Sequence, residues 1–293
     1  FAYPEGLVPG TTYYWRIDEV NDAEPNSPWK GNIWSFWIPP KKAYDAVPAD
    51  GSQFVLPDVT LKWTAGFRAK LHYVYFGDDY DTVNSAAGGV ARTTTDFTPG
   101  TLETGKTYYW RVDEFDPPST HKGDIWSFTT LPEIGIAETA LMGWWTLDEG
   151  TGTTAVDWSG HGRHGTLTGD PEWVAGFDGG SLQLDGDDYV DTGYAEDLGE
   201  WTIACWAKSP QAPSADAASG PVHREQNYQL NWNHPNEIYR AAAAMSVGGV
   251  WYAASYMPLQ ANRWYYLAAT YDGSVLNAYR DGVLITSNPA PSG

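Results

Sequence analysis

The feature that most constrains this fold is an aromatic segment that occurs twice. Residues 12–19 read TYYWRIDE, and residues 107–114 read TYYWRVDE. Each is followed by a second shared stretch, KGNIWSF at 30–36 and KGDIWSF at 122–128. Tyr13 and Tyr108 are 95 residues apart, which is the length of a small all-β domain and too long for a solenoid repeat. We therefore expect each copy to have its own core.

The two copies are not equally complete. Residues 41–132 can hold a whole domain, whereas residues 1–40 hold the C-terminal part of one, and residues 133–293 follow a different pattern. An isolated pair of strands is marginally stable in water. We expect the chain to be a piece of a longer protein, truncated at both ends, with further domains on both sides. The proline-rich joint at 38–42 predicts a semi-rigid connection between consecutive domains.

Strand patterns dominate the chain. Residues 59–63, 71–76 and 108–112 alternate apolar and polar side chains with the two-residue period of half-buried strands. Glycine and proline punctuate these runs, and no convincing amphipathic helix is present. The run Ala241 to Ala244 favours a helix by propensity, but aromatic strand-like runs flank it, so we expect a strand of small residues. The sequence predicts an all-β protein.

Charge and composition exclude several functions. The 37 acidic residues outnumber the 17 Lys and Arg, for a formal net charge of −20, which disfavours nucleic acid as a partner. The chain has no apolar run long enough for a membrane span. Cys205 is the single cysteine, so an intrachain disulfide is impossible, and we expect its thiol to act as a small buried apolar group.

The repeated segment resembles part of a fibronectin type III domain, an immunoglobulin-like β-sandwich. Residues 7–17 and 102–112 share its turn, its tyrosine and its following strand, and the resemblance implies that Tyr13 and Tyr108 are tyrosine corners. By the two-residue period, we expect alternate residues of the second copy to face the core and the solvent. The inward set is Tyr108, Trp110 and Val112, and the outward set is Tyr109, Arg111 and Asp113.

The last part of the chain resembles a LamG-like jelly roll of the concanavalin A-like superfamily. Three motifs near its start occur in order, at residues 143–152, 157–167 and 181–190, and the similarity continues nearly to residue 293. It implies a two-sheet sandwich. Members of that family carry further strands after the hairpin at 279–284, so we expect this sandwich to be unclosed, with an edge that following residues or a neighbouring chain would fill.

The sequence contains no recognisable catalytic motif. Retaining glucanases on this fold need two carboxylates on one face at about 5 Å, and the pattern Glu-x-Asp-x-x-Glu is absent. The motifs of zinc peptidases, zinc deaminases and serine hydrolases are also absent. We therefore predict no enzyme activity within this segment.

Calcium is the one cofactor that the sequence favours. Ca²⁺ binds carboxylate and carbonyl oxygens on turns, and Asp157, Asp187 and Asp188 lie in glycine-rich acidic turns. The jelly-roll resemblance implies Asp157 as a side-chain ligand. His164, with His161, is a further candidate metal ligand, although the surrounding glycine-rich turn favours a backbone role. The acidic residues at 78–81 are better explained as a solvated turn.

A sugar site is the second candidate. Sugar rings stack on aromatic faces, and their hydroxyls hydrogen-bond amides and carboxylates. In residues 228–234 the amides Gln229, Asn231 and Asn233 share one strand face, and aromatic and apolar residues share the other. Trp251 and Tyr252 are further candidate ligand-binding residues. The alternative is an ordinary core face beside a wet amide face.

Together these patterns predict a non-catalytic structural or adhesive segment of a large extracellular or cell-surface protein, whose jelly roll contacts a glycan or a neighbouring surface protein. The alternative is a substrate-targeting, carbohydrate-binding part of a secreted glycoside hydrolase or lyase whose catalytic domain lies outside this segment. A catalytic domain elsewhere in the parent protein would distinguish the two.

Overall fold

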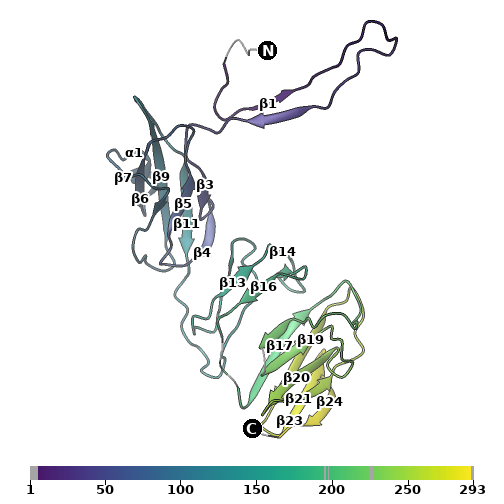
Figure 1. Ribbon diagram of the computed structural model, residues 1–293. Coiled ribbons are helices and arrows are strands. Elements are labelled where there is room, and N and C mark those ends of the chain that lie inside the picture. Colours follow the sequence, from purple (N-terminus) through teal and green to yellow (C-terminus); the bar gives the residue numbers. More distant parts are fainter. Residues whose placement is uncertain (1–5, 195, 197, 225–226, 292–293) are drawn as a thin grey trace. The chain divides into compact units, whose positions relative to one another are not determined.

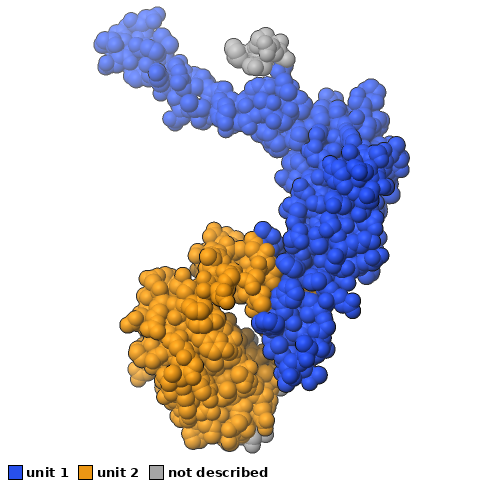
Figure 2. Space-filling view, turned by 180° about the vertical axis from the view of Figure 1, so that it is seen from behind, with its two compact units in different colours: residues 1–144, 151–162 blue, residues 145–150, 163–293 orange. Residues whose placement is uncertain are grey.

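A computed structural model describes residues 6–194, 196, 198–224 and 227–291. The described residues are almost entirely strands and loops, with one short helix, so the predicted all-β class is confirmed. The chain divides into two compact units, residues 1–144 with 151–162 and residues 145–150 with 163–293 (Figure 2). The three domain ranges expected from the sequence stay a prediction.

The first copy of the repeat forms a two-stranded antiparallel sheet, here called the N-terminal hairpin. Its strands are β1 (Thr12–Trp15) and β2 (Trp34–Trp37) (Figure 1). Tyr13 lies opposite Phe36, and Trp15 lies opposite Trp34. The Tyr13 hydroxyl accepts a hydrogen bond of 2.7 Å from the backbone N–H of Val8. This is the local bond that the predicted tyrosine corner requires.

The second copy forms a two-sheet arrangement around its own core. The larger sheet has the order β4-β11-β9-β6-β7, with β10 also on β9, and the smaller has the order β3-β5-β8. The elements are β3 (Tyr44–Val47), β4 (Ser52–Val55), β5 (Leu61–Thr64), β6 (Leu71–Gly77), α1 (Tyr80–Ser85), β7 (Val90–Arg92), β8 (Asp96–Phe97), β9 (Thr107–Asp116), β10 (Ser119–His121) and β11 (Ile125–Thr130).

The core between these sheets is aromatic. Trp110 on β9 is fully buried and lies 6.3 Å, centroid to centroid, from Trp63 on β5. Phe76 on β6 stacks on Tyr108 at 5.3 Å. The Tyr108 hydroxyl accepts a 3.1 Å hydrogen bond from the N–H of Glu103. The inward orientation predicted for Tyr108, Trp110 and Val112 is confirmed, since all three are buried.

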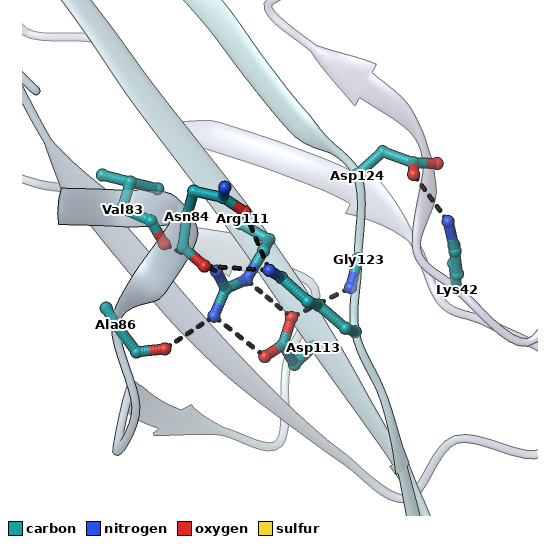
Figure 3. A network of polar contacts seen from close by, with 9 residues as sticks. Lys42, Val83, Asn84, Ala86, Arg111, Asp113, Gly123 and Asp124 are labelled. Carbon is teal, nitrogen blue, oxygen red and sulfur yellow. Dashed lines mark hydrogen bonds and ion pairs between the residues drawn. The ribbon is translucent and has the colours of Figure 1, made fainter. Parts of the chain in front are cut away.

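The expectation that Arg111 and Asp113 face solvent was wrong, because both side chains are buried. The Arg111 guanidinium pairs with Asp113 at 2.8 Å and donates to the carbonyl oxygens at the C-terminal end of α1, those of Val83, Asn84 and Ala86 (Figure 3). Helix α1 and its following turn thus cover the face that alternation assigns to solvent. Six residues are too few to show helical periodicity.

Residues expected to form a solvated acidic turn instead begin this helix. The Asp79 carboxylate accepts a 2.8 Å hydrogen bond from the N–H of Thr82 and so caps α1. Asp113 also accepts a 2.9 Å hydrogen bond from the N–H of Gly123. A Cβ on Gly123 would overlap the carbonyl oxygen of Val112, so this close approach requires glycine.

The second unit contains a sandwich of two four-stranded sheets, β17-β22-β23-β24 and β18-β19-β20-β21, and two smaller pairs, β13-β16 and β14-β15. The remaining strands of the chain are β12 (Thr154–Ala155), β13 (Gly165–Thr168), β14 (Glu172–Ala175), β15 (Gly180–Gln183), β16 (Tyr189–Asp191), β17 (Trp201–Ala207), β18 (Val222–Arg224), β19 (Tyr228–Asn231), β20 (Ala242–Val247), β21 (Val250–Ser255), β22 (Tyr265–Tyr271), β23 (Val275–Arg280) and β24 (Val283–Pro289). Of these, β12 belongs to the first unit.

Aromatic and small side chains fill the sandwich. Trp201, Leu230 and Tyr265 belong to one continuous core. The strand of small residues predicted for Ala241 to Ala244 is confirmed for Ala242 to Ala244, which lie on β20 and are fully buried, whereas Ala241 precedes the strand in a turn with positive φ. Cys205 packs against the same core, and burial raises the pKa of its thiol to about 12. The thiol is therefore protonated at neutral pH, as expected for an apolar role.

Candidate functional site

An open hollow lies on the outer face of the β17-β22-β23-β24 sheet and is here called the aromatic hollow. Its volume is about 640 Å³. Its lining residues come from strands and turns that are distant in sequence. They are Phe177, Trp206, Arg263, Trp264, Tyr266, Asp281 and Gly282.

Strand alternation places two of the rings outside the core. On β17, Trp201 is buried and Trp206 is 43% exposed, because the two residues differ in parity along the strand. On β22, Tyr265 faces the core and Tyr266 faces outward. Trp206 lies directly opposite Tyr266 across the two strands, and their ring centroids are 5.3 Å apart.

A third ring extends this surface. Phe177, in the turn between β14 and β15, stacks on Trp206 with centroids 3.7 Å apart and an interplanar angle of 12°. Phe177 is 54% exposed. Exposed aromatic clusters are uncommon on a soluble surface without a binding role. The three rings together form a continuous aromatic surface at the hollow.

Charged groups lie beside the rings. Asp281 and Gly282 form the two-residue turn between β23 and β24, and both have positive φ, as this hairpin turn requires. The Asp281 carboxylate accepts a 3.0 Å hydrogen bond from the N–H of Tyr266 and lies 3.1 Å from the Arg263 guanidinium. The hollow therefore offers hydrogen-bond donors and acceptors next to apolar rings.

This combination suits a ligand with both apolar faces and hydroxyl groups. The C–H faces of a sugar ring stack on aromatic side chains, and arginine and carboxylate groups hydrogen-bond the hydroxyls. Among the described lining residues, Asp281 is the one carboxylate. Glycoside hydrolysis ordinarily needs two carboxyl groups that flank the bond, and the described lining supplies one.

Three of the predicted ligand-binding residues lie on the outer face of the other sheet. Gln229 and Asn231 are on β19 and Trp251 is on β21. Gln229 lies 2.9 Å from the His223 ring and accepts a 3.2 Å hydrogen bond from the Asn231 amide. Asn231 is only 3% exposed, so its amide is little accessible to a ligand from solvent.

The remaining two predicted residues lie elsewhere. Tyr252 is on the inner face of β21 and packs against the sandwich core. The Asn233 side chain accepts hydrogen bonds from Ser214 and donates one to Ser219, so it fixes a neighbouring loop. The five predicted residues are thus not brought together, and their role in binding stays a prediction.

The predicted metal ligands belong to different units. Asp157, in the first unit, is fully buried, and its Oδ1 accepts hydrogen bonds from the N–H groups of Trp144 and Ser159 at 3.0 and 2.9 Å. His164, in the second unit, is half-buried beside β13. Two backbone bonds explain the burial of Asp157 without a cation. Calcium at Asp157 stays a prediction.

One cluster of aspartates in the second unit brings carboxylate oxygens that could bind a metal ion close together. Oxygens of Asp170, Asp185 and Asp188 lie within 4.8 Å of one another, whereas Asp187 is outside this group. The Asp188 charge raises the pKa of Asp185. Asp188 already accepts hydrogen bonds from the N–H groups of Asp170 and Asp185. Hard carboxylate oxygens fit Ca²⁺ by type, but the same hydrogen bonds account for this turn by themselves.

The sequence reasoning missed the aromatic hollow. Its residues come from four separate segments, which no local motif connects. One signal was present: Trp201, Ile203 and Cys205 have the parity of the core face on their strand, so Trp206 belongs to the opposite face. A large aromatic residue on the polar face of a strand identifies a candidate binding surface.

Comparisons with known proteins bear on the second unit. Residues 184–293 match the family described as the concanavalin A-like lectin/glucanases superfamily. This match supports the jelly-roll resemblance, whereas the fibronectin type III resemblance stays a prediction. No curated protein matches the chain.

Among solved structures, the chain is similar to one described as the structure of alpha-L-rhamnosidase from Dictyoglumus thermophilum. The identity is 14% and the TM-score is 0.28, and the match covers 59% of this chain and 18% of that chain. Within the part of the chain that the structure describes, no helix is long and apolar enough to cross a membrane.

Proposed function

We propose that this chain is a non-catalytic, carbohydrate-binding segment of a larger extracellular protein, and that the aromatic hollow is its sugar site. The observation that carries the proposal is the exposed surface of Phe177, Trp206 and Tyr266 beside the Arg263–Asp281 pair. The match of residues 184–293 to a family of lectins and glucanases supports it. The repeated N-terminal region would then act as a spacer that presents the jelly roll to a glycan.

Affinity electrophoresis of the whole chain against a panel of polysaccharides tests this function. Trp206→Ala should weaken binding to any retained glycan about tenfold or more, because aromatic contacts contribute about 0.5–1.5 kcal/mol beyond their buried area and about 1.4 kcal/mol is tenfold. Trp144→Ala is the matched control, since Trp144 is 53% exposed and does not line the hollow. Equal retention of the two variants would refute the assignment of the site.

Binding specificity should depend on the polar pair. Arg263→Met keeps much of the side-chain length but removes the guanidinium donors. If the hollow binds sugar, this variant should lose discrimination among glycans that differ in hydroxyl orientation, with overall retention less affected than in Trp206→Ala. Unchanged selectivity would show that Arg263 does not contact the ligand.

The calcium prediction has a separate test. Thermal unfolding of the chain with free Ca²⁺ and with a chelator should give different melting temperatures if the folded state binds the ion. Asp188→Asn and Asp157→Asn would then distinguish the two acidic turns. The sugar proposal does not depend on the outcome, because neither turn lines the aromatic hollow.

A further inference from the structure

The N-terminal hairpin exposes the residues that form the core in the complete copy. Trp15 is 44% exposed and Phe36 is 41% exposed, whereas their counterparts Trp110 and Phe128 are fully buried. The same contrast holds for Ile17 and Trp34 against Val112 and Trp126. The hairpin therefore has a contiguous apolar face of the kind that marks an interaction site.

The two copies have the same strand register. Trp15 lies opposite Trp34, as Trp110 lies opposite Trp126. Tyr13 lies opposite Phe36, as Tyr108 lies opposite Phe128. The hairpin thus presents a preformed copy of the β9–β11 surface, and the complete copy shows what covers such a surface.

The cover in the complete copy comes from residues 41–106. Trp63 on β5 packs against Trp110, and Phe76 on β6 packs against Tyr108. Strand β6 also pairs with β9 along the edge opposite β11. The corresponding edge of β1 has no strand paired with it among the described residues. An added strand can therefore form backbone hydrogen bonds there.

The opposite face of the hairpin carries a second feature of this interface. Arg16 pairs with Asp18 at 2.7 Å, and Asp18 accepts a hydrogen bond from the N–H of Gly31. This repeats the arrangement of Arg111, Asp113 and Gly123. In the complete copy, Arg111 also donates hydrogen bonds to the carbonyl oxygens at the end of α1, and its side chain is 2% exposed. The Arg16 side chain is 39% exposed.

We infer that the N-terminal hairpin is a docking surface for one kind of occupant, a polypeptide segment with the strand pattern of residues 41–106. Its β5-like and β6-like strands cover the apolar face and extend β1, and the C-terminal carbonyls of its α1-like helix bind Arg16. This segment completes a second sandwich of the same kind as the complete copy. This inference is independent of sugar binding by the second unit.

The test joins a second copy of residues 41–106 directly to residue 12 of the chain, in place of residues 1–11. Amide hydrogen exchange at residues 12–17 and 33–37 should slow at least about tenfold, since exchange reports local opening. Tryptophan fluorescence should shift to shorter wavelength as Trp15 and Trp34 become buried. Exchange as fast as in the original chain would overturn the inference.

Two side-chain variants of the fused chain provide the matched comparison. Trp15→Ser removes a core-facing residue and should abolish the protection. Tyr14→Ser removes a residue that is 73% exposed and points to the other face, and it should leave most of the protection. Equal effects of both variants would contradict the proposed packing.

A second format guards against misfolding of the fused chain. A separate polypeptide of residues 41–106, added to the unmodified chain, should protect the same amides of the hairpin. The same polypeptide with Trp63→Asp and Val74→Asp should not, because both residues belong to the core that the docking rebuilds. Absence of protection in both formats would refute the docking surface, whatever the result of the glycan experiments.

Discussion

The N-terminal hairpin and the β9–β11 hairpin have nearly the same sequence and the same strand register, but they differ in burial. Trp15 is 44% exposed, and Trp110 is fully buried. Each has a tyrosine whose hydroxyl accepts the N–H five residues earlier. The comparison teaches that pairing and corner geometry follow from local sequence, whereas burial depends on the rest of the sandwich.

The largest difference between the copies is expected for the paired tryptophans. Trp110→Ala should reduce the free energy of unfolding of its domain by about 3–5 kcal/mol, because it leaves a large cavity in a packed core. Trp15→Ala should change stability by no more than about 0.5 kcal/mol, as exposed substitutions do. Urea unfolding of both variants measures this. Equal losses would break the comparison, since they would mean that the hairpin is already covered.

The arginines should differ almost as much. Arg111→Met leaves Asp113 buried without its cation and should cost about 3–5 kcal/mol. Arg16→Met should have little effect, because Arg16 and Asp18 are both solvent-accessible. Thermal unfolding of the two variants against the original chain tests this contrast. A stable Arg111→Met protein would show that the buried ion pair is not needed for this domain.

A smaller and more equal effect is expected for the tyrosine corners. Tyr108→Phe removes the hydroxyl that accepts the Glu103 N–H and should cost about 0.5–1.5 kcal/mol. Tyr13→Phe should raise the amide exchange rate at Val8 without affecting the complete copy. Tyr109→Phe is the control, because its neighbour Tyr108 makes the corner bond. No change at Val8 would indicate that local sequence does not fix this corner.

The smallest expected effect is on how stability changes with pH. The Arg16 guanidinium lowers the pKa of Asp18, so the stability that this pair contributes is present above the ordinary pKa and is lost as pH falls through the depressed value. Burial raises the pKa of Glu114, so its effect has the opposite sign: stability falls as pH rises through the raised value. Carboxyl NMR titration should show both directions, and Arg16→Gln should raise the pKa of Asp18 alone.

Sequence patterns predicted the structural features that depend on residues close together in the sequence. The alternation of Tyr108, Trp110 and Val112 is local, and the structure confirms their burial. The strand at Ala242 to Ala244 was also predictable, because its aromatic flanks outweigh alanine's helix propensity. These features need no knowledge of distant contacts.

The same reasoning did not predict features that depend on contacts between residues far apart in the sequence. Arg111 is buried because a six-residue helix some 25 residues earlier covers it, and nothing near Arg111 indicates this. Trp206 forms the aromatic hollow with Phe177 and Tyr266, which lie on separate segments. Parity along β17 identifies Trp206 as outward, but only the folded chain shows which rings meet it.

The glycine that accompanies each arginine–aspartate pair limits which substitutions the chain can tolerate. A Cβ on Gly31 would overlap the carbonyl oxygen of Ile17, just as one on Gly123 would overlap that of Val112. In a complete mutational scan, both positions should therefore reject even alanine, although Gly31 belongs to the hairpin whose aromatic residues are exposed. The backbone contact thus constrains sequence variation at Gly31 whether or not the aromatic face is covered, so the glycine is as much a part of the repeated pattern as the Tyr-x-Trp-Arg-x-Asp segment that precedes it.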